Sequence, residues 1–161
     1  MADHVPAQLG YCMPAEWEEH EATWLAWPRD PLTWVAGIEA AEDAFVEMVR
    51  ALSPGERVEI LVHDEGQHER VAQRLADEGI SNTRLHTAGH VDSWIRDYGP
   101  TFLTSPRGAP LAGVDWRFNA WGEKYEGLLA DDRLGAVILE LAGAQAFRTG
   151  VVMEGGSFDV N

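Results

Sequence analysis

The chain has 161 residues, 45% of them apolar and 24% charged, which is typical of a soluble globular protein rather than a disordered segment. Its net charge of −15 argues against nucleic acid and against an anionic membrane as partners, because phosphate binding requires Lys and Arg to displace counterions. The same charge favours a cationic ligand through long-range attraction, although a solvated acidic surface is the simpler explanation.

Cys12 is the only cysteine, so no intrachain disulfide can form and an oxidising compartment gains no support. No apolar run approaches the roughly 20 residues needed to span a bilayer. Residues 1–14 also lack the basic and then apolar pattern of a secretory signal. We therefore expect a cytoplasmic location.

The first half of the chain combines short apolar runs with segments whose apolar residues recur every three or four positions, the patterns of buried strands and amphipathic helices. Thr33 is a suitable N-cap for the first helix, whereas Pro54-Gly55 and Gly79 end the first and second helices. The predicted elements are a strand at 22–27, a helix at 34–52, a strand at 58–63, a helix at 65–77 and a strand with a turn at 82–89.

The second half is expected to contain more strands. The turn-rich segment 105–110 (SPRGAP) indicates a hairpin, and the glycines of 154–156 (EGG) indicate a turn. The predicted elements are strands at 101–104 and 111–118, a helix at 130–142, and strands at 146–153 and 157–160. This order predicts an α/β fold without an internal domain boundary. The last strand stops at Asn161, which suits either an interrupted chain or a natural edge strand.

Residues 94–100 (WIRDYGP) form the first candidate site. Gly99-Pro100 forces a loop after a segment expected to be extended, so that Trp94 and Arg96 share one face and Arg96 does not pair with Asp97. A carboxylate beside an aromatic ring at a strand end suits a planar cation, because a guanidinium can pair with it through two hydrogen bonds. The alternative is an Asp that caps a helix N-terminus or braces a loop, with the Trp packed in the core.

Glu154 is the second candidate. It follows the apolar run at 151–153, so we expect it at the carboxyl end of a buried strand, where ligand sites of α/β sheets lie. The two glycines after it let a ligand or a backbone approach closely. The alternative is an exposed turn residue. The segment lacks the lysine and spacing of a phosphate loop, so nucleotide binding is not expected.

Other reactive side chains offer weaker patterns. His86, His90 and Asp92 could suggest a metal site, but no second cluster stands at ligand spacing, so no metal is predicted. His90 and Asp92 could also pass for a catalytic pair. No serine lies in a G-x-S-x-G pattern. Cys12 has no identifiable activating base and is predicted to be structural or incidental.

Four segments in the same order resemble the agmatine deiminase family, which includes the bacterial-type peptidyl-arginine deiminases. They are 13–28 (MPAEWEEHEATWLAWP), 94–102 (WIRDYGPTF), 114–125 (VDWRFNAWGEKY) and 154–161 (EGGSFDVN). Within the first, HEATWLAWP is more similar to agmatine deiminase than to a generic deiminase. The resemblance implies a pentein, a pseudo-five-fold α/β propeller around a polar channel. Residues 1–161 would be a partial pentein with about two of five modules, the N-terminal portion of an incomplete catalytic domain.

The resemblance also implies a mechanism. In the family a cysteine thiolate attacks the guanidinium carbon, a histidine helps ammonia leave, and water hydrolyses the covalent thiouronium intermediate. Asp97 matches the Asp that binds the guanidinium, Glu154 matches the acidic residue that supports the catalytic histidine and the substrate, and Trp94 matches a Trp of the substrate pocket. The family's His-x-Asp motif and nucleophilic cysteine would follow Asn161.

The letters GHVD at residues 89–92 imitate the His-x-Asp motif, but in the family that motif lies well after EGG, so His90 is given no catalytic role. Cys12 does not occupy the place of the nucleophile either, and the chain alone is expected to be inactive.

The resemblance implies a parent enzyme of putrescine biosynthesis and polyamine metabolism. It would hydrolyse agmatine, a small cationic guanidine, to N-carbamoylputrescine and ammonia without metal or organic cofactor. One alternative is a peptidyl-arginine deiminase. Another is a non-catalytic chain that binds agmatine or arginine, or that pairs with a second chain supplying the missing C-terminal modules. Homo-oligomerisation is left open.

Overall fold

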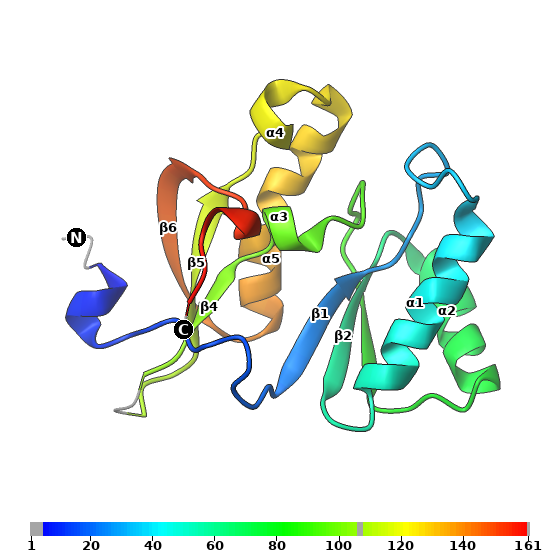
Figure 1. The fold of residues 1–161 in the computed structure, drawn as a ribbon, viewed down its shortest axis with the longest axis horizontal. Helices are drawn as coiled ribbons and strands as arrows, with labels where there is room; N and C mark the ends of the chain where they lie inside the picture. The colour runs from blue at the N-terminus through cyan, green and yellow to red at the C-terminus, as the bar shows by residue number, and fades with distance from the viewer. Residues whose placement is uncertain (1–4, 106–107, 161) are drawn as a thin grey trace. The chain divides into compact units, whose positions relative to one another are not determined.

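The computed structural model describes residues 5–105 and 108–160 (Figure 1). The chain divides into two compact units, Glu19–Ile95 and Met1–Glu18 with Arg96–Asn161. Each unit contains one three-stranded sheet together with helices, so the predicted α/β class is confirmed. That both units belong to one catalytic domain stays a prediction.

The unit Glu19–Ile95 is a parallel sheet of order β1-β2-β3, with two helices on the same face (Figure 1). The central strand is buried on both of its faces. On one face, Val58, Ile60 and Val62 belong to the core that also contains Phe45. Glu59 and Leu61, which alternate with them, are also buried. The elements are β1 (Ala22–Ala26), α1 (Ile38–Leu52), β2 (Arg57–Val62), α2 (Glu65–Asp77) and β3 (Thr83–Thr87). The predicted order of these five elements is confirmed.

The helix α2 has the predicted bounds because both of its ends carry local signals. The Asp64 side chain accepts a hydrogen bond from the Gln67 backbone N–H at 2.8 Å, which satisfies a donor of the first turn. Gly79 has a φ of +67°, a left-handed conformation that follows a helix end readily only in glycine.

The helix α1 begins four residues later than predicted. Gly37, at its N-terminal boundary, has a φ of 94°, which a right-handed helix cannot accommodate. Thr33 is not its cap, because the Thr33 hydroxyl donates to the Asp92 carboxylate at 3.0 Å. The Trp34 ring packs edge-on against Phe45 instead, so tertiary contacts determine the segment before Ile38.

Ile60→Val is expected to lower the free energy of unfolding by about 1 kcal/mol, because one methylene is removed from a side chain with no exposed area. Urea unfolding followed by far-UV circular dichroism measures the change. Val35→Ala is the control, since Val35 is fully exposed and its truncation should change stability by less than about 0.5 kcal/mol. Equal stabilities of the two variants would contradict the assignment of Ile60 to the core.

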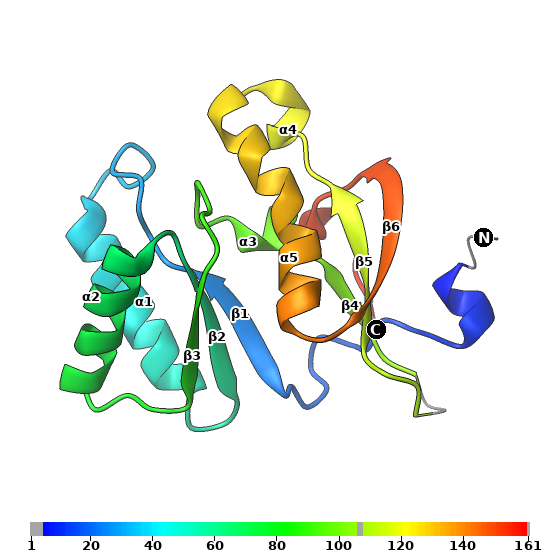
Figure 2. The same cartoon turned by 180° about the vertical axis from the view of Figure 1, so that it is seen from behind.

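The second unit is a mixed sheet of order β4-β5-β6, and α5 packs on β5 and β6 (Figure 2). The antiparallel pairing of β4 with β5 confirms the predicted hairpin, although Pro106 and Arg107 of its connection lie outside the described residues. The elements are η1 (Pro6–Leu9), β4 (Thr101–Leu103), β5 (Ala112–Arg117), α4 (Ala120–Glu123), η2 (Glu126–Arg133), α5 (Leu134–Leu141), β6 (Gln145–Val152) and η3 (Gly155–Ser157).

The predicted bounds of one helix and the predicted final strand of this unit are wrong. The predicted helix 130–142 is regular only from Leu134, because η2 takes up the residues before it as a 3-10 helix. The predicted strand 157–160 does not form: residue 157 ends η3, and residues 158–160 lie in no strand. The final residue, Asn161, lies outside the described part of the chain. No helix that the structure describes has the length and hydropathy needed to cross a bilayer.

Candidate functional site

Asp97 lies in α3 (Ile95–Tyr98), a single helical turn, and not in the predicted extended segment. The turn stops before Gly99-Pro100, where the proline disfavours helix in the residue before it. In a turn, consecutive side chains are about 100° apart, so Arg96 and Asp97 do not point to opposite faces as predicted. Trp94 precedes the turn, so the predicted sharing of one face by Trp94 and Arg96 stays a prediction.

Glu154 follows β6 in extended conformation, with φ −98° and ψ 156°. The prediction that its strand is buried is wrong, because β6 is an edge strand and Val151 and Val152 are 50% and 46% exposed. Glu154 itself is half-buried. It therefore stands at the carboxyl end of a strand, as predicted, but at the edge of the sheet.

Gly155 brings the Glu154 loop against the α3 turn. A Cβ added to Gly155 would lie 2.4 Å from the carbonyl oxygen of Arg96, which is too close for any side chain. The Arg96 Nε–H donates to the carbonyl oxygen of Gly155 at 3.1 Å. The close backbone approach predicted for the glycines after Glu154 is therefore confirmed at Gly155, whereas an added Cβ at Gly156 would meet nothing within 4 Å.

Arg96 also reaches the opening segment of the chain. Its Nη2 donates to the Glu16 carboxylate at 2.7 Å. One guanidinium therefore ties the Asp97 turn to both the Gly155 loop and the Glu16 segment, which are 59 and 80 residues away in sequence. These contacts hold the backbone beside Asp97 in a defined place.

Burial raises the pKa of Asp97, and the negative charge of Glu154 raises it further. The positive charge of Arg96 and the nearby Trp121 side chain lower the same pKa. The two candidate carboxylates therefore lie close enough to repel each other, and a bound cation would relieve that repulsion.

The raised pKa of Asp97 predicts a pH-dependent stability difference. Asp97 ionises more easily in the unfolded chain, so its negative charge destabilises the fold. This destabilisation is complete above the pKa of Asp97 in the folded state, and it disappears below the unfolded-state pKa of about 3.9. Asp97→Asn should therefore raise Tm at pH 7, and the gain should shrink as the pH falls towards about 4.

Thermal unfolding of the wild type and the variant across this pH range measures the difference. Asp77→Asn, at an exposed position of α2, is the matched control and should give no such trend. A Tm for Asp97→Asn that is lower than the wild-type value at pH 7 would contradict the assignment.

Trp121 belongs to an unusual backbone turn, Ala120–Glu123, labelled α4. Its residues have φ values of 51°, 55°, 81° and 63°, so the turn is left-handed, and only Gly122 tolerates this without penalty. Each other residue costs roughly 1–2 kcal/mol in this conformation. The Asn119 side chain supports the turn by accepting from the Gly122 N–H at 2.9 Å.

Trp121 was not predicted as a site residue. The signal available in the sequence is the flanking Asn119 and Gly122, the two residue types that most readily accompany a left-handed turn. A row of edge-to-face ring contacts leads to the indole. Tyr98 contacts Phe118 at 6.0 Å between ring centroids, and Phe118 contacts Trp121 at 5.4 Å.

Trp94, the third predicted site residue, belongs to the other compact unit, three residues before Asp97 in the chain. Its ring stacks on that of Trp34, with centroids 6.2 Å apart and planes 18° apart, and it remains 46% exposed. The alternative of a Trp fully packed in the core is therefore excluded. Its role as a pocket wall stays a prediction.

His86, His90 and Asp92 have separate neighbours. The His86 Nε2 lies 2.6 Å from the Glu59 carboxylate, whereas the His90 Nε2 lies 2.8 Å from the carbonyl oxygen of Trp27. Burial lowers the pKa of His90, so its neutral form is favoured. Among the described residues, no group of three or more His, Cys, Asp or Glu side chains could hold a metal ion.

Cys12 is exposed and pairs with Thr104 through an isolated antiparallel bridge. Thr104 follows β4, whereas Asp97 precedes it, so the thiol and the carboxylate flank opposite ends of this strand.

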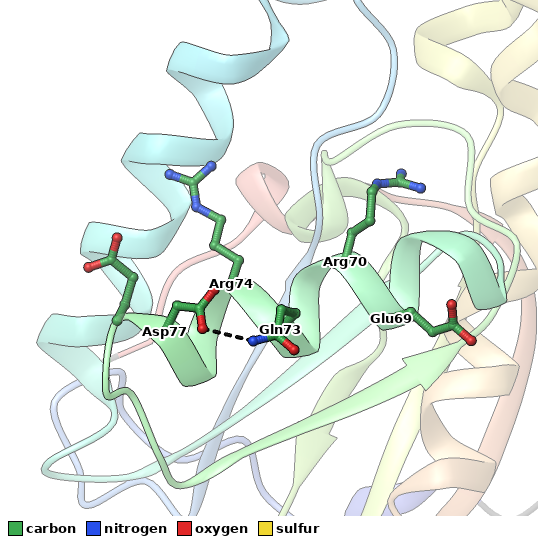
Figure 3. Close-up of a pocket in the computed structure, with 6 residues that line it drawn as sticks. Glu69, Arg70, Gln73, Arg74 and Asp77 are labelled. Carbon is green, nitrogen blue, oxygen red and sulfur yellow. Dashed lines mark hydrogen bonds between the residues drawn. The ribbon is translucent and has the colours of Figure 1, made fainter.

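A surface depression along α2 is lined by charged and amide side chains (Figure 3). Gln73 donates to Asp77 at 2.8 Å, and Arg74 pairs with Asp43 on α1. Because Gln73, Arg74 and Asp77 already have partners, the depression is not a candidate for the functional site.

Comparisons with known proteins agree with the resemblance. The sequence model of the Porphyromonas-type peptidyl-arginine deiminase family matches residues 12–161. Agmatine deiminases of Ectopseudomonas mendocina and Pseudomonas aeruginosa are each 40% identical to this chain. Each match covers 97% of this chain and 42% of the relative. The chain therefore spans about 42% of the length of these curated relatives.

The fold matches as well. The solved structure of the agmatine deiminase of Enterococcus faecalis superposes with a TM-score of 0.89 at 32% identity, covering 99% of this chain and 44% of that chain. The predicted partial pentein is confirmed by this match.

Proposed function

The chain belongs to the Porphyromonas-type peptidyl-arginine deiminase family, and from that membership we propose that it supplies the substrate-binding carboxylates of an agmatine deiminase. The enzyme would hydrolyse agmatine to N-carbamoylputrescine and ammonia. The remaining modules, with the nucleophilic cysteine and the His-x-Asp motif, would be contributed by chain beyond these 161 residues.

The proposal rests on one observation, the juxtaposition of Asp97 and Glu154. The negative charge of Glu154 acts on the half-buried Asp97, and the Arg96–Gly155 contacts keep the two loops together. Two carboxylates held in this way suit a planar cation, because charge-assisted hydrogen bonds to a guanidinium are strong and directional. The net charge of −15 would also attract such a ligand.

The chemistry follows from holding the guanidinium. Asp97 would accept two of its N–H groups and keep it planar, while Glu154 would stabilise the positive charge and orient the catalytic histidine. The thiolate then forms a bond to the guanidinium carbon, and the carbon–nitrogen bond breaks as the leaving amino group takes a proton from the catalytic histidine and departs as ammonia. Water hydrolyses the thiouronium, which regenerates the thiolate and leaves the urea product. No step requires a metal or an organic cofactor.

Agmatine is favoured over a peptidyl substrate because relatives 40% identical to this chain are named agmatine deiminases. A peptidyl-arginine deiminase is the second candidate, favoured by the description of the family. As an agmatine deiminase, the protein would act in putrescine biosynthesis and polyamine metabolism in the cytoplasm.

The test is an ammonia-release assay of the longer protein, in which this chain continues through the remaining modules, with agmatine and with arginyl peptides as competing substrates. We expect turnover of agmatine with the higher kcat/KM. Preference for arginyl peptides would favour the second candidate, and binding of either ligand without turnover would favour a non-catalytic binding protein.

The 161-residue chain alone should release no ammonia, whereas recovery of activity on mixing with the missing modules would indicate a split enzyme. Turnover by the chain alone that is abolished in Cys12→Ser would overturn the assignment of the nucleophile to a later module.

A further inference from the structure

We propose that Arg96 and Glu16 are positioning residues for Glu154: Glu16 holds the Arg96 guanidinium, and that guanidinium holds the loop that carries Glu154. The inference rests on the proposed function, from which it takes the role of Glu154. It adds the opening segment of the chain to the groups on which that role depends.

The backbone of Glu154 lies between two attached residues. On one side, the Met153 N–H donates to the carbonyl oxygen of Arg117, the last residue of β5, at 3.2 Å. On the other side, the carbonyl oxygen of Gly155 accepts from Arg96 Nε at 3.1 Å. The first contact joins two backbones and survives any change of side chain, whereas the second depends on the side chain of Arg96.

The loop also packs on the stem of the Arg96 side chain, beside α3 (Figure 1). A Cβ added to Gly155 would lie 2.7 Å from both Cδ and Nε of Arg96, in addition to its close approach to the Arg96 carbonyl oxygen. The loop therefore has little space between itself and this side chain. A change in the direction of the Arg96 side chain should displace the loop.

Glu16 sets that direction. The Arg96 side chain is 57% exposed, and a long side chain at such exposure has many rotamers available to it. Its Nη2 donates to the Glu16 carboxylate at 2.7 Å. Because the guanidinium is planar, Nε and Nη2 keep a fixed relation to each other. A carboxylate bound at Nη2 therefore also determines where the Nε–H points, and so supports the bond to Gly155.

The segment that carries Glu16 is itself attached to the sheet of the same unit. Four residues earlier, Cys12 and Thr104 exchange two backbone hydrogen bonds of 2.9 Å. The Tyr11 hydroxyl donates to the carbonyl oxygen of Pro110 at 3.0 Å, and Tyr11 is buried. The opening segment thus brings the Glu16 carboxylate to a defined place.

The turn that carries Asp97 has supports that do not involve the guanidinium. Tyr98 follows Asp97, is only 3% exposed, and packs edge-on against Phe118 with ring centroids 6.0 Å apart. The helix α5 approaches the same turn closely, since a Cβ added to Gly135 would lie 3.2 Å from the Tyr98 carbonyl oxygen. Loss of the guanidinium should therefore displace the loop after β6 and leave Asp97 in place.

Arg96→Lys keeps the positive charge but replaces the planar fork by one ammonium group, which cannot reproduce the paired bonds to Glu16 and Gly155. In the longer protein, it should lower kcat for agmatine about tenfold, because a positioned carboxylate is displaced. KM should stay within about twofold, since Asp97 would still hold the substrate. Exposed ion pairs contribute little to stability, so Tm should remain close to the wild-type value.

Arg148→Lys is the matched control. Arg148 is an exposed arginine of the same unit, and it forms an ion pair with Asp115 at 3.7 Å between the paired strands β6 and β5. The same chemical exchange is therefore made away from the Glu154 loop. The kcat and KM of this variant should equal those of the wild type.

NMR of the 161-residue chain tests the contact without any turnover. The carbonyl-carbon shift of Gly155 reports the hydrogen bond to its oxygen. Hydrogen exchange of the Ser157 N–H, which donates to the carbonyl oxygen of Glu154 at 2.9 Å, reports the order of the loop. In Arg96→Lys the shift should change and the exchange should become faster, whereas Arg148→Lys should give wild-type values for both.

Glu16→Ala leaves Arg96 in place, so it decides the question if Arg96→Lys fails to fold. It should change both NMR signals in the same direction and should lower kcat, by less than Arg96→Lys does. Combined with Arg96→Lys it should have no further effect, because its influence passes through the guanidinium.

NMR signals that are unchanged in both Arg96→Lys and Glu16→Ala overturn the inference. A displaced loop with a wild-type kcat also overturns it, as does an effect of Glu16→Ala that is equally large with and without Arg96→Lys. If the wild-type longer protein turns over neither agmatine nor arginyl peptides, the proposed function fails, while the NMR signals still decide whether Arg96 and Glu16 hold the Glu154 loop.

Discussion

Asp97→Asn in the longer protein is expected to lower kcat/KM for agmatine at least about 30-fold, which corresponds to about 2 kcal/mol of transition-state binding. Asparagine has nearly the same shape as aspartate but no charge, and its amide nitrogen would face a guanidinium that can only donate. Because Asp97 would hold the guanidinium in the ground state and more strongly in the transition state, both KM and kcat should change. Steady-state kinetics with agmatine measures both.

Asp77→Asn is the control for this substitution, since it makes the same chemical change on the exposed surface of α2. Its kcat/KM should equal that of the wild type. A kcat/KM for Asp97→Asn close to the wild-type value would remove Asp97 from the proposed site. The expected gain in Tm for the same variant separates a loss of function from a loss of fold.

Gly155→Ala is expected to lower kcat/KM about 100-fold, because displacement of a positioned group by about 1 Å costs rates of that order. The added Cβ would lie 2.4 Å from the backbone carbonyl oxygen of Arg96, which cannot move aside as a flexible side chain can. The loop carrying Glu154 must therefore shift away from the turn carrying Asp97. The 161-residue chain should also show a lower Tm.

Gly156→Ala is the matched control, one residue further on. An added Cβ there meets no atom within 4 Å, so the variant should retain the Tm of the wild type and a kcat/KM within a few-fold of it. Similar losses in the two variants would show that the segment needs glycine for its conformation and not for the approach to Arg96. A Gly155→Ala protein with wild-type kinetics would remove this contact from the account of the site.

The local signals of the sequence predicted the regular elements well. The bounds of α2 depend on Asp64 and Gly79, which act within a few residues of the helix ends, and these bounds are correct. The start of α1 depends instead on the packing of Trp34 against Phe45, eleven positions along the chain, and the expected cap at Thr33 placed it too early. The prediction of a final strand failed because alternation of apolar and polar residues gives no information about the neighbour that a strand needs.

In the candidate site, too, local sequence signals and tertiary contacts determine different features. The family motifs singled out Asp97 and Glu154 as candidates, and the sequence by itself determined the family and the partial pentein fold. The juxtaposition of these two carboxylates was decided only by tertiary structure, through the contact between Arg96 and Gly155, 59 residues apart. The edge-to-face contacts of Phe118 with Tyr98 and with Trp121 likewise form only when distant residues are folded together. Local sequence patterns record short-range conformational preferences, whereas the orientation of a carboxylate depends on distant groups that folding brings beside it.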